Sequence, residues 1–268
     1  LLRYVQHAQQ EGGLGDAMRL ADAERSLPDD VDAVLDQIFD VLRSASGNDF
    51  SRYKRSTVLR RLGRRMQVHQ MDAPSGYLAY LRKHPEEIDA LFQDLLISVT
   101  SFFRDPELFE ALENEVIPQI VADKDAGAPI RTWVVGCATG EEAYSVAMLL
   151  HEHAAQQKPP PALQVFATDI DRNALSFARR GVYPESIAAD LVADRLERFF
   201  VREGSTYRVR SELSDIVLFA EHNLLTDPPF LNLDLISCRN LLIYLERDLQ
   251  ESVFALFHYA LRPTGYVV

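Results

Sequence analysis

The chain has 268 residues, of which 47% are hydrophobic and 25% are charged, and its formal net charge is −12. These values are typical of a globular protein with room for one large domain and a smaller one. The acidic balance argues against general affinity for nucleic acid, whose phosphates need a basic surface. No apolar run approaches the roughly 20 residues that a bilayer span requires, so we expect a cytoplasmic protein without membrane insertion.

Residues 1–27 begin without methionine and contain a Gly-Gly-Leu-Gly stretch among scattered charges. We interpret them as a linker or the end of an upstream domain, which would make the chain a fragment of a longer protein. An initiator codon directly before Leu1 in the parent gene would contradict this interpretation.

An all-helical domain is predicted for residues 28–97. Pro28 and the two aspartates after it mark a helix start, and apolar residues at i, i+3 and i+4 spacing continue that helix to about Ser44. A second helix is expected over residues 56–69. Two shorter helices are expected over residues 75–83 and 85–97.

The second of these helices carries a concentration of positive charge. Residues 52–65 include seven lysines and arginines and no acidic residue. With Leu59, Leu62 and Met66 as the buried stripe, the arginines should project along the exposed flanks as i, i+4 pairs. The cluster is either a solvated face or a contact surface for an anionic partner, such as an acidic protein or nucleic acid. The substrate-binding candidates are Arg55, Arg60, Arg61, Arg64 and Arg65.

Residues 98–106 form a bridge into an α/β domain. Thr100 and Arg104 are its useful polar groups, and Phe102 and Phe103 between them are expected to pack beneath a site. From the sequence alone, Arg104 either serves that site, caps a helix or pairs with a surface carboxylate. A helix is predicted to follow over residues 106–122.

A strand, a glycine-containing loop and a helix are predicted over residues 130–154. The strand covers residues 130–135, and the helix begins near Glu142. Gly136 and Gly140 would let the backbone turn sharply and approach a ligand, next to the free N–H groups of the helix. Two glycines are also common in such turns for steric reasons only.

The next strand, residues 164–168, places Asp169 at its carboxyl end. An acidic residue at this position can accept both ribose hydroxyls of an adenosyl cofactor. The loop lacks the G-x-G-x-x-G spacing of pyrophosphate-binding turns, and Glu141 and Glu142 stand where a diphosphate would lie. Negative charge repels phosphate, so the sequence disfavours NAD and ATP. It favours S-adenosylmethionine, which has an adenosine, a cationic centre and no phosphate.

Helices are expected over residues 172–181 and 188–200. Residues 200–221 then alternate or run apolar around a Gly204-Ser205 turn, which predicts a small antiparallel hairpin inserted into the fold. Asp227-Pro-Pro-Phe230 imitates a motif of adenine and cytosine amino-methyltransferases. It precedes the next strand, residues 233–237, instead of closing it, so we interpret it as a turn.

Polar residues close that strand. Arg239 and Asn240 follow it directly, and Tyr244 is expected on the first turns of a helix. All three are candidates for a binding site. The alternatives are a salt bridge for Arg239, a helix cap for Asn240 and a place in the core for Tyr244. Residues 261–268 begin a last strand pair within which the chain stops, so we expect a C-terminal truncation with a compromised sheet edge.

Five segments in this order resemble the CheR family of chemotaxis-receptor glutamate methyltransferases. They are Ser98-Val-Thr-Ser-Phe-Phe-Arg104, Cys137-Ala-Thr-Gly-Glu-Glu-Ala-Tyr-Ser145, Phe166-Ala-Thr-Asp-Ile-Asp171, Asn223-Leu224 and Cys238-Arg-Asn-Leu-Leu-Ile-Tyr244. The resemblance runs from about residue 30 to the end of the chain. It implies an α/β fold with a Rossmann-like class I methyltransferase sheet over residues 98–268, behind the all-helical domain, with an antiparallel insert over about 200–221.

The resemblance also implies a function. S-adenosylmethionine would be the cofactor, and glutamates on the cytoplasmic helical bundle of a chemoreceptor would be the substrate, contacted by the arginine-rich helix. Residues 1–27 resemble the junction behind a methylesterase domain. Because the loop of the antiparallel insert is short, we expect no tether to a C-terminal receptor peptide.

Site residues follow from the same resemblance. Arg104 would contact the cofactor and orient the acceptor carboxylate, and Tyr244 would face the methyl group, so both are catalytic candidates. The family usually has asparagine where Ser98 stands, and Asn223 could equally be a turn residue. The cofactor-binding candidates are Ser98, Thr100, Arg104, Gly136, Glu142, Asp169, Asn223, Leu224, Arg239 and Asn240.

Methyl transfer to a glutamate is an in-line displacement by a carboxylate that is already ionised, so it needs alignment and no general base. The scattered histidines and the lack of a metal-ligand or Ser-His-Asp grouping agree with that chemistry. Two other functions stay open. A non-catalytic S-adenosylmethionine sensor would use the same binding residues. A nucleic-acid methyltransferase would bind its substrate with the arginine-rich helix, although the overall acidity of the chain counts against it.

Overall fold

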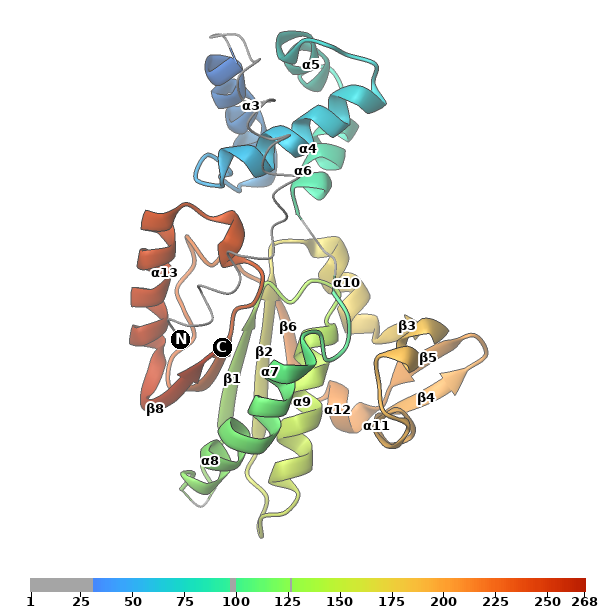
Figure 1. The fold of residues 1–268 in the computed structure, drawn as a ribbon, viewed down its shortest axis with the longest axis vertical. Helices are drawn as coiled ribbons and strands as arrows, with labels where there is room; N and C mark the ends of the chain where they lie inside the picture. The colour runs from blue at the N-terminus through green and yellow to red at the C-terminus, as the bar shows by residue number, and fades with distance from the viewer. Residues whose placement is uncertain (1–30, 97–99, 126) are drawn as a thin grey trace. The chain divides into compact units, whose positions relative to one another are not determined.

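The computed structural model describes residues 31–96, 100–125 and 127–268. The chain divides between Leu95 and Leu96 into two compact units, each shown in Figure 1. The linker predicted for residues 1–27 and the candidate Ser98 lie outside the described residues. Within the described ranges, every helix is too short or too polar to cross a bilayer.

The first unit consists of helices whose apolar faces pack together. They are α3 (Val31–Ser46), α4 (Arg55–Val68), α5 (Pro74–Leu81) and α6 (Pro85–Leu95). Helix α3 lies against α5 and α6, and α4 lies against α6. The four helices expected from the apolar spacing are confirmed, with small shifts at their ends. The buried stripe of α4 is Val58, Leu62 and Met66, so Val58 takes the place predicted for Leu59.

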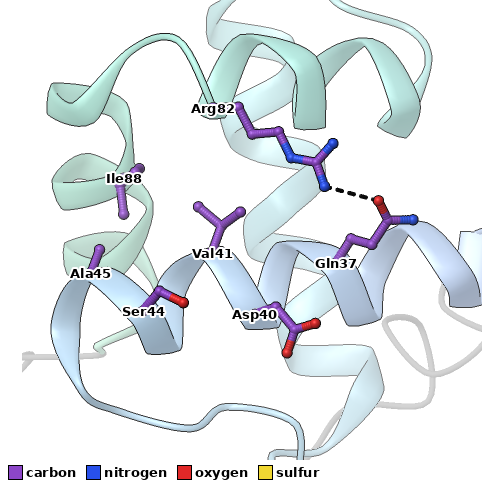
Figure 2. A pocket seen from close by; sticks show the side chains of 7 residues that line it. All are labelled: Gln37, Asp40, Val41, Ser44, Ala45, Arg82 and Ile88. Atoms are coloured by element: carbon purple, nitrogen blue, oxygen red, sulfur yellow. Dashed lines mark hydrogen bonds between the residues drawn. The ribbon is translucent and has the colours of Figure 1, made fainter.

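A surface hollow lies between α3 and the connection from α5 to α6 (Figure 2). Arg82, just after α5, donates a hydrogen bond to the side-chain carbonyl of Gln37 on α3, at 2.9 Å. This bond ties the end of α5 to the exposed side of α3. The hollow is lined by Gln37, Asp40, Val41, Ser44, Ala45, Arg82 and Ile88.

A buried ionic cluster joins α4, α5 and α6. The Glu87 side chain on α6 accepts hydrogen bonds from Arg65 Nε at 2.9 Å and from the Tyr77 hydroxyl at 2.6 Å. His69 Nε2 lies 2.7 Å from the other carboxylate oxygen. Arg65 was predicted on an exposed flank of α4, and this prediction is wrong, because its side chain is only 17% exposed and pairs with Glu87. It is not available to a partner.

The second unit is built on a parallel sheet of five strands in the order β6-β2-β1-β7-β8. Every neighbouring pair is parallel. The strands are β1 (Ile130–Val135), β2 (Leu163–Asp169), β6 (Val217–Glu221), β7 (Leu233–Ser237) and β8 (Leu261–Val267). On one side of β1 lie β2 and then β6, and on its other side lie β7 and then β8. The switch point, where open parallel sheets bind ligands, therefore lies at the carboxyl ends of β1 and β7.

Helices cover this sheet as expected for a Rossmann-like fold. In Figure 1, α7 (Pro106–Ala111), α8 (Ile117–Ala122) and α9 (Glu141–Ala154) group on one side of the strands, and α13 (Arg247–Ala260) lies beside β8. The helix predicted over residues 106–122 contains a π-helical turn, Leu112–Val116. Pro118 follows it, and a proline ring clashes with the carbonyl four residues earlier in a regular α-helix. The wider turn relieves that clash.

A small antiparallel sheet is inserted between α10 (Arg172–Arg180) and β6. Its order is β3-β5-β4, from β3 (Val182–Pro184), β4 (Phe200–Glu203) and β5 (Thr206–Val209). The insert and its Gly204-Ser205 turn are confirmed, but both predicted boundaries, 200 and 221, are wrong. The small sheet begins earlier, with β3, which pairs with β5. Residues 217–221 form β6, which pairs with β2 in the main sheet because Val217 and Phe219 are buried against its core. The helix expected over 188–200 is shorter, as α11 (Ala193–Phe199) after a 3-10 turn (Glu185–Ala189).

The stability of the helical unit should depend on the charge of Glu87. Burial alone would raise the pKa of this carboxyl, but hydrogen bonds from Arg65, Tyr77 and His69 outweigh burial and hold the pKa at about 2, below its ordinary 4.5. A carboxyl with a lowered pKa contributes stability that is complete above the unfolded-state pKa and is lost as pH falls through the folded-state pKa. The contribution should therefore be complete above pH 4.5 and disappear toward pH 2.

We expect Glu87→Gln to lower the free energy of unfolding by about 3 kcal/mol at neutral pH. The variant should also lose most of the wild type's decline in stability between pH 5 and pH 2. Urea unfolding at several pH values measures both effects. Asp40→Asn is the matched control, since Asp40 pairs with Arg43 on the surface and should change stability by less than about 1 kcal/mol. Equal effects of the two substitutions would contradict the assignment.

Candidate functional site

The loop from β1 to α9 turns at two glycines that have different reasons to be there. Gly140 has φ +95°, and a Cβ at this position would lie 2.8 Å from the Ala178 Cβ. Gly140 is buried, so the steric alternative accounts for it. Gly136 has φ +66° and is exposed, and its nearest neighbour would be Leu241 at 3.4 Å. Gly136 is therefore the glycine that leaves backbone open at the switch point.

Asp169 ends β2 and is bonded to that loop. One carboxylate oxygen accepts a hydrogen bond from the Ala138 backbone N–H at 2.8 Å, and the other accepts one from the Asp171 N–H at 2.9 Å. Burial raises the pKa of this carboxyl. A backbone hydrogen bond from Ile170 also acts on this carboxylate. Because a carboxylate has about four lone-pair sites, Asp169 can still accept a ribose hydroxyl. The residue can therefore hold the loop and a ribose together.

Glu142 lies on the first turn of α9 and reaches the end of β7. Its carboxylate accepts a hydrogen bond from the Ser237 hydroxyl at 2.6 Å and lies 3.4 Å from Arg239 Nη1. Burial raises its pKa, and the charge of Arg239 opposes that rise. Glu141 beside it accepts a hydrogen bond from Thr139 at 2.6 Å, and burial raises its pKa as well.

These carboxyls make the site fit a cation and not a phosphate. Glu141 and Glu142 begin α9, Asp169 ends β2, and each is partly withdrawn from water. Burial raises the pKa of the Cys137 thiol between them, and the charges of Asp169, Glu142 and Glu141 add to that rise. A buried carboxylate gains from a positive ligand and is opposed by a negative one. An adenosyl cofactor with a cationic sulfonium and ammonium group suits this donor set: Asp169 would hold its ribose, and Glu142 its cationic end.

Arg239 holds the walls of the site together. Its side chain is 4% exposed, and Nη2 donates to the Arg104 carbonyl and to the Asp105 carboxylate, both at 2.6 Å. The guanidinium also lies over the Phe109 ring, 5.1 Å from its centroid. The salt-bridge alternative thus describes this guanidinium, which links the segment before α7 to Glu142. A cofactor contact by the main chain of Arg239 stays a prediction.

The segment from Thr100 to Asp105 packs as expected on its two phenylalanines. Phe102 is buried, and the Phe103 N–H donates to the Ser145 hydroxyl of α9 at 3.1 Å. Phe103 and Asp105 have positive φ values of 49° and 59°, a conformation that persists only when neighbours enforce it. Thr100 and Arg104 are half-buried. Their contact with the cofactor stays a prediction.

Asn223 and Leu224 begin a turn after β6. The Asn223 N–H donates to Asp227 at 2.8 Å, and its side-chain carbonyl accepts from the Leu225 N–H at 2.9 Å. The turn alternative therefore explains that carbonyl. Asp227-Pro-Pro-Phe230 precedes β7, as predicted, but it is a bend and irregular chain, and the turn itself lies at residues 224–226. Phe230 stacks on Phe166 of β2 with ring centroids 4.5 Å apart.

The residues after Arg239 differ in backbone from the prediction. Asn240 is exposed and has φ +58°, and Tyr244 is half-buried in a 3-10 turn, Leu242–Tyr244, that precedes α13. Tyr244 was expected on the first turns of the helix itself. Their assigned contacts, with the cofactor for Asn240 and with the methyl group for Tyr244, stay predictions.

The structure thus gathers five of the ten cofactor-binding candidates around the ends of β1, β2 and β7. Gly136, Glu142, Asp169 and Arg239 border the switch point, and the Arg104 carbonyl is joined to them. The candidate arginines of α4 belong to the other unit. Sequence reasoning missed Ser237 and Asp105. Only Ser237 had a signal, as a polar residue closing an apolar strand.

Comparison with known proteins agrees with this geometry. The family described as the SAM binding domain of CheR methyltransferases matches residues 98–268. The family described as the all-alpha domain of CheR methyltransferases matches residues 33–96. The chain belongs to the CheR methyltransferase family. Its cofactor is S-adenosylmethionine, as the chemistry of the three carboxyls indicates.

Relatives within the CheR family cover most of this chain. The chemotaxis protein methyltransferase of Escherichia coli K12 is 32% identical over 245 residues, which cover 87% of this chain and 82% of that protein. A protein of Rhodobacter capsulatus, described as an uncharacterized 104.1 kDa protein in the hypE 3' region, is 43% identical over 233 residues. Those residues cover 87% of this chain and only 24% of that protein. This CheR chain therefore spans about a quarter of that relative.

Asp169→Asn should weaken cofactor binding by about 10- to 100-fold, because hydrogen bonds to a charged acceptor become bonds to a neutral one. Calorimetric titration with S-adenosylhomocysteine measures the change. Asp171→Asn is the charge-matched control: Asp171 caps α10 by accepting from the Asn173 and Ala174 N–H groups, and asparagine caps helices equally well. Unchanged affinity in the Asp169 variant, or an equal loss in both, would refute the ribose assignment.

Proposed function

We propose that this CheR chain transfers the methyl group of S-adenosylmethionine to glutamate side chains on the cytoplasmic helical bundle of a chemoreceptor. The products would be glutamate methyl esters. Each ester removes one negative charge from a receptor helix, a local change able to bias its signalling states. The proposal rests on one observation, the position of Arg104 among the carboxyls of the site.

A glutamate substrate needs a cation at this site. Glu142 and Asp169 would repel an incoming carboxylate. Arg104 lies close enough to Glu142 to lower the pKa of that carboxyl by its charge, and its carbonyl is fixed by Arg239 at 2.6 Å. An arginine fork can hold a carboxylate through two parallel hydrogen bonds. Arg104 is thus suited to orient the acceptor while neighbouring carboxyls hold the cofactor.

The chain's own residues would supply alignment and exclusion of water. When bound, the cofactor supplies an electrophilic methyl group on a sulfonium. Asp169 and Glu142 would bind its ribose and its cationic end, Arg104 would orient the acceptor carboxylate, and Tyr244 would form the wall facing the methyl group. Because the acceptor is ionised at neutral pH, no residue has to remove a proton.

The exposed arginines of α4 support an acidic protein substrate. Arg60 and Arg64 are exposed one helical turn apart, Arg61 is half-buried, and Arg55 pairs with Asp32. We propose this arginine face, without Arg65, as the contact for a glutamate-bearing receptor helix. The insert carries a two-residue turn, Gly204-Ser205, so we propose that recognition needs no C-terminal receptor peptide.

Labelled S-adenosylmethionine and a receptor cytoplasmic fragment test the reaction directly. We expect label on the receptor that alkali releases as volatile methanol, since a carboxyl methyl ester is hydrolysed by base. Label that survives alkali would mean methylation at nitrogen and would overturn the proposal. Cofactor binding without any transfer would indicate a sensor instead.

Charge reversal on α4 tests the substrate surface. Arg60→Glu with Arg64→Glu should lower kcat/KM for the receptor by about tenfold or more and leave the affinity for S-adenosylhomocysteine unchanged, because both arginines would meet only the protein substrate. Arg210→Glu with Arg247→Glu changes the net charge equally at exposed positions of the other unit. Equal kcat/KM values for the two double variants would contradict the proposed surface.

A further inference from the structure

Tyr183 connects the small antiparallel sheet to the cofactor loop. It lies on β3 and is 1% exposed. Its hydroxyl donates a hydrogen bond to the Thr139 carbonyl at 2.7 Å. The same oxygen lies 3.1 Å from the position of a Cβ on Gly140. One side chain of the insert therefore contacts the last two residues of the loop between β1 and α9.

The ring of Tyr183 contacts the other wall of the site. It meets the Phe102 ring edge-on with centroids 5.0 Å apart. Phe102 lies in the segment that carries Thr100 and Arg104. Burial raises the pKa of the Tyr183 phenol, so the hydroxyl stays protonated and can donate at every physiological pH. Through its ring and its hydroxyl, Tyr183 therefore links the segment of Phe102 to the loop of Thr139.

The loop needs such a support because its backbone is unusual. Ala138 has a positive φ of 46°, and Gly140 follows at +95°. Non-glycine residues in this region persist only when their surroundings enforce the conformation. Two ties lie between these positions: the Asp169 carboxylate holds the Ala138 N–H, and the Tyr183 hydroxyl holds the Thr139 carbonyl. Backbone hydrogen bonds from the Cys137 N–H to the Thr168 carbonyl and from the Gly140 N–H to the Cys137 carbonyl, both at 2.9 Å, also hold the loop. Loss of the second tie would therefore weaken the support of the loop at Thr139.

We propose that Tyr183 is a positioning residue for S-adenosylmethionine. Its hydroxyl fixes the loop of residues 136–140, so that the Asp169 carboxylate keeps its orientation and its remaining lone pairs face the ribose. The small sheet is then part of the cofactor site, although none of its strands reaches the switch point. The inference depends on the cofactor within the proposed function and not on the identity of the methyl acceptor.

Tyr144 provides a matched control. It is also a buried tyrosine of the same core, and its hydroxyl donates one hydrogen bond, to the Ala178 carbonyl at 3.1 Å. That hydroxyl bonds a helix carbonyl and not the cofactor loop. Tyr183→Phe and Tyr144→Phe therefore each remove one buried hydroxyl, and only the first removes a tie to the loop.

The test measures cofactor affinity, stability and loop exchange in both variants. We expect Tyr183→Phe to weaken S-adenosylhomocysteine binding by about fivefold, the loss expected for one neutral hydrogen bond. Amide hydrogen exchange at residues 137–140 should become faster in the same variant. Both substitutions should lower the thermal unfolding temperature by similar amounts. Tyr144→Phe should nevertheless keep wild-type affinity and wild-type amide exchange in the loop.

Two results would overturn the proposal. One is wild-type affinity in Tyr183→Phe, and the other is the same affinity loss in both variants, which would follow from general destabilisation. Should Tyr183→Phe not fold, amide exchange in the unaltered protein decides: fast exchange at residues 137–140 would show that the loop is not held. Because these measurements use the product S-adenosylhomocysteine and no methyl acceptor, they stand whether or not glutamate is the substrate.

Discussion

Negative charge at the carboxyl ends of parallel strands is the constraint on which this structure depends. Three carboxyls, Glu141, Glu142 and Asp169, lie around the Cys137 thiol, where burial opposes their ionisation. A buried charge is tolerated only when it is paired or hydrogen-bonded. The surrounding chain supplies the partners: the hydroxyls of Thr139 and Ser237, the guanidinium of Arg239 and the backbone N–H groups of Ala138 and Asp171. The positive charge of S-adenosylmethionine would complete this set.

The same partners determine the shape of the site. Arg239 neutralises Glu142 and at the same time holds the Arg104 carbonyl and the Asp105 carboxylate, from a segment more than 130 residues earlier in the chain. Charge compensation and the placement of Arg104 are therefore one interaction. An arginine serves both purposes because its planar fork offers donors in several directions, which a lysine ammonium cannot reproduce in the same geometry.

Sequence reasoning succeeded where the signal was local. The strand ends, the glycine loop and Asp169 follow from short apolar runs and the residues that close them, so the cofactor could be predicted from them. The Rossmann-like sheet was expected from the resemblance to the CheR family. Arg65 was misplaced because its partner, Glu87, lies 22 residues away on a helix whose packing the periodicity of α4 does not reveal. The strand β6 was assigned to the wrong sheet for a related reason: an apolar run of five residues pairs equally well with either neighbour. Tyr183 carried no signal, because its partner Thr139 is 44 residues away.

In the helical unit, too, a buried charge is paired, but there the pairing removes an arginine from the surface. Its buried Glu87 forms an ion pair with Arg65 and hydrogen bonds with His69 and Tyr77. Arg60 and Arg64 on the same helix stay exposed. Glu87 and the more distant Asp94, 3.8 Å from Arg65 Nη1, thus compensate the charge of Arg65. The outer face keeps its charge in a chain whose net charge is −12. Because like charges repel, such a face is retained at some cost to stability. An anionic partner would remove that cost, which is the physical reason to look for the receptor contact on this helix.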